Sequence, residues 1–239
     1  MYYNKLKFYY RKLINRFSKY PIIYNNGFNF NKTLSYHKIN LIIDIGAFTG
    51  TYALSLRRFG YKKKIVSFEP IKDSYLKLLK NADKDRNWII HERVALGDKN
   101  KNIKIYVSKK KDSSSILKIK RKHINIEPES KITNCEITKM IKLDSIIENY
   151  TKNHICLLKI DTQGYEFKVL KGLGNKIKKF KLIQIELSLD ELYEGQENWL
   201  KILKYLNKYN FQIWDIVPGF KNKKIGQLMQ FDLILFKTK

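Results

Sequence analysis

An acid and two glycines follow a short apolar segment in the stretch LIIDIGAFTGTY, residues 41–52. Asp44, Gly46 and Gly50 fall within seven positions, just before sequence with helical periodicity. Glycine allows a tight turn or the close approach of a ligand, and a carboxylate accepts hydrogen bonds from an ammonium group or from loop amides. A nicotinamide site would show G-x-G-x-x-G. The G-x-x-x-G spacing instead suits a cofactor without phosphate groups, with a simple tight turn as the alternative.

A second acid, Glu69, ends the next apolar segment, KIVSFEP, 25 residues after Asp44 (69 − 44 = 25). A carboxylate at the end of the second strand of a nucleotide-binding sheet can accept hydrogen bonds from both hydroxyls of a ribose. The stretch VALGD ends a third apolar segment, where an adenine ring would rest. Together these strand ends indicate an adenosyl cofactor. For Glu69 alone, a favourable charge at a helix N-terminus is the alternative.

The stretch KIDTQGYE supplies acids for a proton-transfer step. Asp161 ends a further apolar segment and is the first candidate for a general base, or for a group that positions the acceptor. Glu166, at the start of the next helix, is a second candidate. Each has a structural alternative, as a cap of the turn or as a favourable charge in the first helical turn. Lys159, two residues before Asp161, can pair with one of these acids and lower its pKa.

Glu186 is the third catalytic candidate, because it ends the strand IQIEL beside the one that ends at Asp161. Two neighbouring carboxylates could begin a Mg²⁺ site. No third ligand is in view, so contact with the substrate is the preferred role for Glu186 and we do not expect a metal. For Tyr193, packing is preferred over stacking on a sugar.

A mostly parallel sheet must position these residues. Helical patterns separate the apolar strands, which predicts one doubly wound, Rossmann-like α/β domain that binds ligands at the carboxyl ends of its strands. The strand patterns lie at 41–45, 64–69, 88–97, 155–161 and 181–187. The helical patterns lie at 51–59, 71–79, 166–170 and 199–206. The last two strands, 211–217 and 231–236, have no helix between them and are expected to pair as an antiparallel hairpin.

Residues 98–143 depart from this alternation. Two half-exposed strand patterns, NIKIYVS and CEITKMIKL, flank the charged stretch KKKDSSSILKIKRKH. We interpret residues 98–143 as a strand pair or insertion that carries a mobile loop. They belong to the α/β domain, which is expected to span residues 41–239.

The net charge of +26 raises the question of a polyanionic partner. Lysine is spread through nearly every segment, which favours a compositional bias over a nucleic-acid groove. Residues 1–43 contain no Asp or Glu, and residues 1–40 are expected to form a basic amphipathic helix followed by a loop. Such a helix either packs its apolar stripe on the domain or lies on an anionic membrane surface.

The motifs DIGAFTG, FEP, ALGD and LLKIDTQGYEFKVLKG, in this order, resemble the FkbM family of methyltransferases. The resemblance runs from about residue 41 to the C-terminus. It implies a class I methyltransferase fold, with a seven-stranded sheet whose last strand is antiparallel. It also implies S-adenosylmethionine as cofactor and methyl transfer to a hydroxyl oxygen, often on sugars or natural products.

By position, the resemblance assigns residues to each part of the cofactor. The methionine part would be surrounded by Asp44, Gly46, Ala47 and Gly50. Glu69 would hold the ribose, while Ala95 and Leu96 would lie near the adenine. Phe48 stands where members of the family commonly have asparagine. One polar contact near the cofactor is therefore missing, unless Thr49 replaces it.

The sequence thus predicts a cytoplasmic O-methyltransferase that acts on a hydroxyl of a sugar, a glycolipid precursor or a small metabolite. Two isolated cysteines and the lack of an apolar run of about 20 residues agree with that compartment. The N-terminal helix would suit peripheral membrane contact. A nucleic-acid methyltransferase is one alternative, although the chain lacks an obvious RNA-binding domain. A non-catalytic scaffold, motivated by Phe48, is the other. No pattern specifies an oligomeric state.

Overall fold

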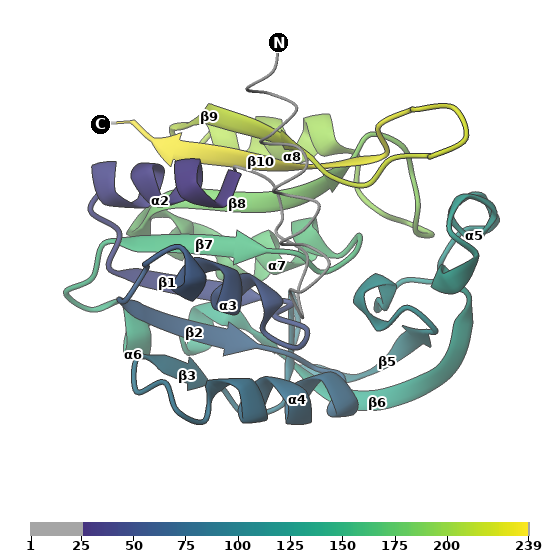
Figure 1. Ribbon diagram of the computed structural model, residues 1–239, viewed down its shortest axis with the longest axis horizontal. Helices are drawn as coiled ribbons and strands as arrows, with labels where there is room; N and C mark the ends of the chain where they lie inside the picture. The colour runs from purple at the N-terminus through teal and green to yellow at the C-terminus, as the bar shows by residue number, and fades with distance from the viewer. Residues whose placement is uncertain (1–25, 239) are drawn as a thin grey trace, which may run out of the picture.

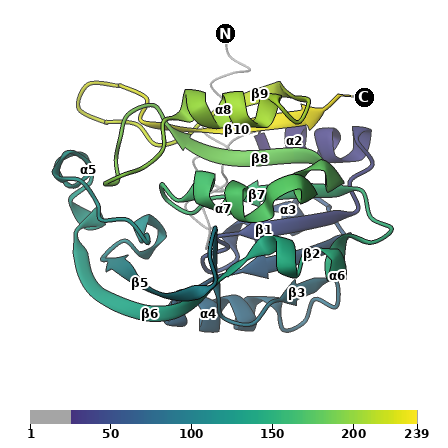
Figure 2. The ribbon, with the colours of Figure 1, turned by 180° about the vertical axis from the view of Figure 1, so that it is seen from behind.

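The computed structural model describes residues 26–238 and contains a seven-stranded sheet with helices on both faces (Figures 1 and 2). In spatial order its strands are β3 (Trp88–Ile90), β2 (Lys64–Phe68), β1 (Leu41–Ile45), β7 (Cys156–Ile160), β8 (Phe180–Ser188), β10 (Gln230–Lys237) and β9 (Phe211–Pro218). β10 is antiparallel to β8 and β9, whereas the other pairs are parallel. The predicted doubly wound sheet with an antiparallel last strand and terminal hairpin is confirmed.

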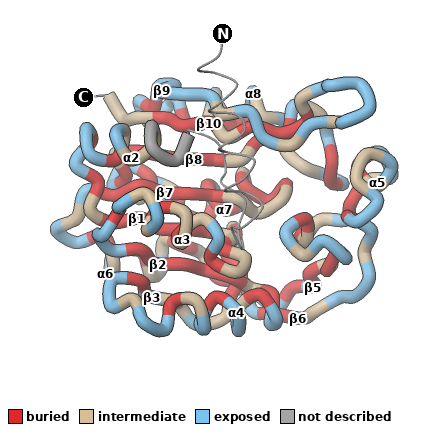
Figure 3. Tube along the Cα trace, in the orientation of Figure 1, coloured by how far each residue is buried: buried red, intermediate tan, exposed pale blue. Residues whose placement is uncertain are grey.

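Helices cover each face because each presents an apolar stripe to the sheet. One face carries α2 (Asn26–Tyr36), α3 (Thr51–Arg58) and α4 (Lys72–Ala82). The other carries α6 (Glu148–Thr151), α7 (Glu166–Leu173) and α8 (Trp199–Asn207) (Figure 2). The central strands are buried along their length, whereas most of β9 is exposed (Figure 3). Across residues 26–238, no helix is long and apolar enough to span a membrane.

The N-terminal region differs from the prediction. The loop expected after Pro21, on the Asn and Gly residues of the stretch YNNGFNFN, is wrong from Asn26 onward, where α2 begins. Leu34 of this helix is only 1 % exposed, and Thr33 accepts a hydrogen bond from the Trp214 indole of β9. Tertiary packing therefore overrides the local Asn and Gly signals. The basic helix expected near residues 5–19, with its membrane contact, lies outside the described residues and stays a prediction.

The predicted third strand, 88–97, is also wrong, because it is two strands in different sheets. β3 ends at Ile90, and β4 (Ala95–Gly97) pairs with β6 (Ile132–Lys142), which also pairs with β5 (Lys101–Ser108). Arg93 lies between β3 and β4 and stabilises this change of sheet. Its guanidinium donates to Pro70 O and contacts Glu136 of β6. The chain is thereby drawn away from the main sheet.

The insertion forms a small sheet beyond the carboxyl ends of β1, β2 and β7 (Figure 1). The predicted strand pair is confirmed as antiparallel β5 and β6. The segment between them contains α5 (Arg121–Ile126) and forms backbone hydrogen bonds with residues 192–194. Lys120 N donates to Leu192 O, and Glu194 N donates to Lys118 O. The mobility expected of this segment stays a prediction.

A buried ion pair joins the two central strands. Asp44 of β1 and Lys159 of β7 are in register, and Lys159 Nζ lies 3.5 Å from Asp44 Oδ1. The second oxygen of Asp44 accepts a hydrogen bond from Ser67 of β2 at 3.0 Å. Burial alone would lower the pKa of Lys159, but the charges of Asp161 and Asp44 raise it above its ordinary value. The lysine therefore stays protonated inside the domain.

We expect Lys159→Met to destabilise the protein by about 3–5 kcal/mol, because it leaves Asp44 charged and unpaired in the interior. The double variant Lys159→Met with Asp44→Asn should recover part of this loss, since it removes both charges. Urea denaturation of the wild type, the two single variants and the double variant measures the coupling. Additive effects of the two substitutions would contradict the pairing.

Candidate functional site

A cavity of about 560 Å³ opens at the carboxyl ends of the central strands. This is a usual size for a small-molecule site. Its walls form two arms on opposite sides of the β1–β7 pair. One part, called the β2 arm, is lined by Glu69, Pro70, Ile71, Val94, Ala95 and Leu96. The other part, called the β10 arm, lies between α3 and the sheet and is lined by Tyr52, Gln184, Asp215, Val217, Asp232 and Ile234. The arms meet at Gly46, Ala47, Lys159 and Asp161.

The two glycines of the loop after β1 are required by the protein's own packing. Gly46 has φ +75°, and a Cβ there would lie 1.8 Å from the backbone oxygen of Asp161. Gly50 has φ +86°, and a Cβ there would lie 2.4 Å from the ring of Trp88. Gly46 and its neighbour Ala47 line the cavity, whereas Gly50 packs against the core. Their contact with the methionine part of a cofactor stays a prediction.

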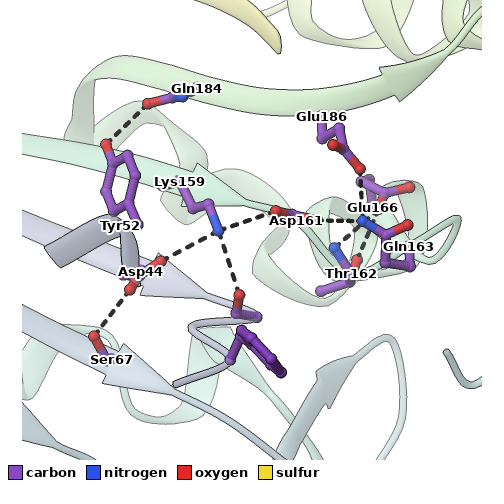
Figure 4. Close-up of polar contacts among 12 residues, drawn as sticks. Asp44, Tyr52, Ser67, Lys159, Asp161, Thr162, Gln163, Glu166, Gln184 and Glu186 are labelled. Carbon is purple, nitrogen blue, oxygen red and sulfur yellow. Dashed lines mark hydrogen bonds and ion pairs between the residues drawn. The ribbon is translucent and has the colours of Figure 1, made fainter. Parts of the chain in front are cut away.

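Asp44 lies beneath this loop and does not line the cavity. Its side chain is fully buried, and its carboxylate contacts Ser67 and Lys159 (Figure 4). Burial raises the pKa of Asp44, and Lys159 and Ser67 oppose that effect. Asp44 therefore supports the loop from below, by fixing the lysine whose Nζ also donates to Gly46 O at 3.3 Å.

Glu69 connects this loop to the start of α4. Its Oε2 accepts a hydrogen bond from Phe48 N at 2.8 Å, and its Oε1 accepts one from Ile71 N at 2.9 Å. Burial raises the pKa of Glu69 to about 8, although both amides oppose it. Phe48 has φ +53°, in the left-handed region that asparagine adopts more readily than phenylalanine. The backbone at position 48 therefore favours asparagine over phenylalanine.

Ala95 and Leu96 form an apolar wall of the β2 arm. Each is 3 % exposed, and both come from β4 of the small sheet and not from the third strand of the main sheet. Ile71 and Ile105 line the same arm. The apolar wall therefore comes from a different strand than expected, and its contact with an adenine ring stays a prediction.

Asp161 lies where the two arms meet. Its side chain is 30 % exposed, with Oδ2 3.3 Å from Lys159 Nζ and Oδ1 accepting from Gln163 Nε2 at 2.8 Å (Figure 4). Because a carboxylate offers about four lone-pair positions, these two contacts leave room for a ligand. Asp161 is thus fixed in orientation and still faces the cavity.

Gln163, which sequence reasoning missed, bridges two acids. Its Nε2 donates to Asp161 and also to Glu186 Oε2 at 2.7 Å, while its Oε1 accepts from the Tyr193 hydroxyl at 2.7 Å. The side chain of Tyr193 is fully buried, which agrees with the packing role and not with stacking on a sugar. The one sequence signal for Gln163 was its place inside KIDTQGYE.

The other two predicted catalytic acids do not line the cavity. Glu166 closes its own turn by accepting from the amides of Thr162 and Gly164, each at 3.0 Å. Burial raises the pKa of Glu166 to about 7. Glu186 accepts from Gln163 and from Gln230, and burial followed by the charge of Asp161 raises its pKa well above the ordinary value. Both acids therefore have structural partners.

The weak alternative of a Mg²⁺ site at Asp161 and Glu186 gains no support from the geometry. The amide of Gln163 lies between the two carboxylates and donates to both. Within the described part of the chain, no group of three or more His, Cys, Asp or Glu side chains could hold a metal ion.

Sequence reasoning also missed the polar residues of the β10 arm. Tyr52 comes from α3, Gln184 from β8 and Asp232 from β10. The available signal was a polar residue inside each of two apolar strands, in LIQIEL and FDLILF.

The β2 arm fits an adenosyl cofactor. Glu69 keeps acceptor positions beside its two backbone contacts, as two ribose hydroxyls would require. Ala95 and Leu96 offer the apolar surface that an adenine ring needs, and the loop at Gly46 leads toward Asp161.

Solved structures share the general arrangement at low identity. TehB from Haemophilus influenzae is 8 % identical, with a TM-score of 0.49, over 94 % of this chain and 66 % of that chain. A precorrin-6y C5,15-methyltransferase from Geobacter metallireducens is 13 % identical, with a TM-score of 0.46, over 87 % of each chain. Among proteins with curated functions, none matches this sequence.

The profile described as the methyltransferase FkbM domain matches residues 44–213. The match begins at Asp44 and ends within β9, so it covers well over half of the chain. It includes Glu69 and Asp161, on which the geometry of the cavity depends. The chain belongs to the FkbM methyltransferase family and is an S-adenosylmethionine-dependent methyltransferase.

Proposed function

We propose that this enzyme methylates a hydroxyl group of a sugar, a glycolipid precursor or a small metabolite. One observation carries the proposal: of the three predicted catalytic acids, Asp161 alone lines the cavity, at the junction of the two arms. A hydroxyl that enters from the β10 arm would meet this carboxylate beside the β2 arm. Such positioning of two reactants, with an acceptor for the proton, is what methyl transfer requires of a protein.

The β2 arm would hold the cofactor through Glu69 at the ribose and through Ala95 and Leu96 at the adenine. The loop at Gly46 and Ala47 would lie along the methionine part. When bound, S-adenosylmethionine supplies a methyl group activated by its positively charged sulfur.

Asp161 would accept the hydrogen bond of the acceptor hydroxyl and, as the oxygen is methylated, its proton. Lys159 cannot serve as the base, because its raised pKa keeps it protonated. It instead holds Asp161 in place from the side of the sheet. Gln163 fixes the other oxygen of the same carboxylate.

The charges of the cavity argue against nucleic acid as the acceptor. Asp161, Asp215 and Asp232 line the β10 arm or its junction, and these carboxylates would repel phosphate groups. The cations that line the cavity, Arg58, Lys111 and Lys159, are fewer than its carboxylates. A small acceptor rich in hydroxyl groups suits these hydrogen-bond acceptors better.

The first test is a calorimetric titration with S-adenosylhomocysteine, with NAD as the control. We expect micromolar binding of S-adenosylhomocysteine and no response to NAD. Affinity should rise with pH up to about 8, because ribose hydroxyls donate to the ionised form of Glu69 and its pKa is raised to about 8. Below that pH, Kd for S-adenosylhomocysteine should increase by up to about tenfold for each pH unit of decrease.

Glu69→Gln provides the control for this slope. The affinity of this variant for S-adenosylhomocysteine should be weaker than that of the wild type. It should also lack the increase between pH 6 and 8 that we expect of the wild type. A wild-type Kd that is flat across this range would remove Glu69 as the ribose ligand.

Asp161→Asn should retain the affinity for S-adenosylhomocysteine within about threefold and lose turnover by about 100-fold or more, because it removes the proton acceptor. Glu166→Gln is the matched control, since it makes the same isosteric change at a carboxylate outside the cavity and keeps an oxygen for the turn. Its turnover should stay near the wild-type value. The rate at which S-adenosylhomocysteine is released, with a panel of sugars and other hydroxyl compounds as acceptors, measures the turnover of both variants. Unchanged turnover in Asp161→Asn would exclude this role.

Phe48→Asn tests the alternative of a non-catalytic scaffold. Asparagine adopts the left-handed conformation more readily and restores a polar side chain, so affinity for S-adenosylhomocysteine should improve by about two- to tenfold. Phe48→Leu, which keeps an apolar side chain in that conformation, should not improve it. A folded wild type that binds no cofactor, together with a Phe48→Asn variant that does, would favour the scaffold.

A further inference from the structure

The β10 arm contains a hydrogen-bonded pair of polar side chains, and a carboxylate lines the same arm. Tyr52 of α3 reaches across the arm, and its hydroxyl donates to Gln184 Oε1 at 2.9 Å (Figure 4). The oxygen of the Gln184 amide thereby accepts a hydrogen bond from within the protein. The Tyr52 hydroxyl therefore donates within the protein, whereas the carboxylate of Asp232, which also lines this arm, accepts hydrogen bonds and donates none when it is ionised.

Within the described part of the chain, Asp232 has no cation of its own. Among residues 26–238 it forms no ion pair, and Lys159, the lysine that lowers its pKa, lies within ion-pair distance of Asp44 and Asp161. Burial, followed by the charge of Asp161, raises the pKa of Asp232 to about 6. At neutral pH most of the protein therefore carries an ionised, poorly compensated carboxylate here.

A second acid of this arm adds to its negative potential, because Asp215 of β9 lines the arm together with Asp232. The remaining walls include the apolar side chains of Val217 and Ile234. An arm with carboxylate acceptors and an apolar surface favours a ligand that brings hydrogen-bond donors, positive charge and a carbon skeleton.

We propose that the β10 arm binds the protonated amine of the acceptor through Asp232, so that the substrate class is an amino sugar or a similar amino alcohol. This inference rests on the proposed function, because it concerns the acceptor of the same reaction. Pairing compensates the charge of Asp232 and leaves a hydroxyl of the same molecule to meet Asp161. A neutral sugar would form hydrogen bonds with Asp232 but would leave its charge uncompensated. A sugar phosphate would add electrostatic repulsion between the phosphate and the carboxylate.

The pairing also explains why oxygen would be methylated in a molecule that carries nitrogen. An amine held protonated by Asp232 has no lone pair and cannot attack the methyl group. In the reaction the bond between the acceptor oxygen and the methyl carbon forms, and the bond between that carbon and sulfur breaks. The hydroxyl proton goes to Asp161. The cofactor leaves as neutral S-adenosylhomocysteine, so that atoms and charges balance.

The experiment compares matched ligands on the protein saturated with S-adenosylhomocysteine. Glucosamine, galactosamine and mannosamine are titrated beside their N-acetyl derivatives, which keep the ring and lose the charge, and beside the 6-phosphates of the neutral sugars. We expect at least one amine to bind about tenfold or more tightly than its N-acetyl partner, and the phosphates to bind most weakly. Equal affinities, or no binding by any amine, would overturn the proposal without any variant.

Asp232→Asn should abolish the preference for the amine while the affinity for S-adenosylhomocysteine stays unchanged, which also reports that the variant is folded. Glu129→Gln is the control, because it removes the same charge from an exposed carboxylate outside the cavity. Persistence of the preference in Asp232→Asn would overturn the role of this residue.

The two levels of inference fail in different ways. A wild-type protein that binds no S-adenosylhomocysteine would overturn the proposed function and this inference together. Binding of S-adenosylhomocysteine without preference for an amine would overturn the inference alone. Methylation at nitrogen, detected by mass spectrometry of the product, would overturn the protective role of Asp232 and O-methylation of this substrate.

Discussion

The ammonium group of Lys159 lies between the carboxylates of Asp44 and Asp161, at 3.5 and 3.3 Å, and also donates to Gly46 O. These contacts join β1, the loop that follows it and the end of β7, at the point where the strand order reverses. An unpaired charge in the interior is costly, so none of these groups can leave the others without a large loss of stability. The loop at Gly46 and the candidate base Asp161 therefore keep a fixed relative position.

The acids around the cavity share a functional group and differ in environment. Glu166 is occupied by backbone amides, and Glu186 by the amides of two glutamines. Glu69 has two backbone donors and still lines the cavity, as does Asp161 with its lysine. Accessible lone pairs, and not acidity alone, separate the acids that can meet a ligand from those that stabilise the fold.

The sequence by itself determined the architecture and the general position of the site. Apolar strands alternating with helical patterns predicted the doubly wound sheet, because a parallel sheet needs a crossover helix between its strands. The residues at the ends of these strands had to gather at one edge, and Glu69, Gly46 and Asp161 do so. Local patterns failed at α2 and at β3–β4, where packing of Leu34 and the contacts of Arg93 outweigh propensity.

Only the tertiary structure decided which residue does what within the site. Spacing along the chain could not show that Gly50 packs on Trp88, or that Glu166 closes its own turn. Nor could it show that Gln163 bridges Asp161 and Glu186, or that residues from α3, β8 and β10 form a second arm. The physical reason is that a strand pattern fixes which face a side chain takes, whereas its partners come from segments distant in sequence.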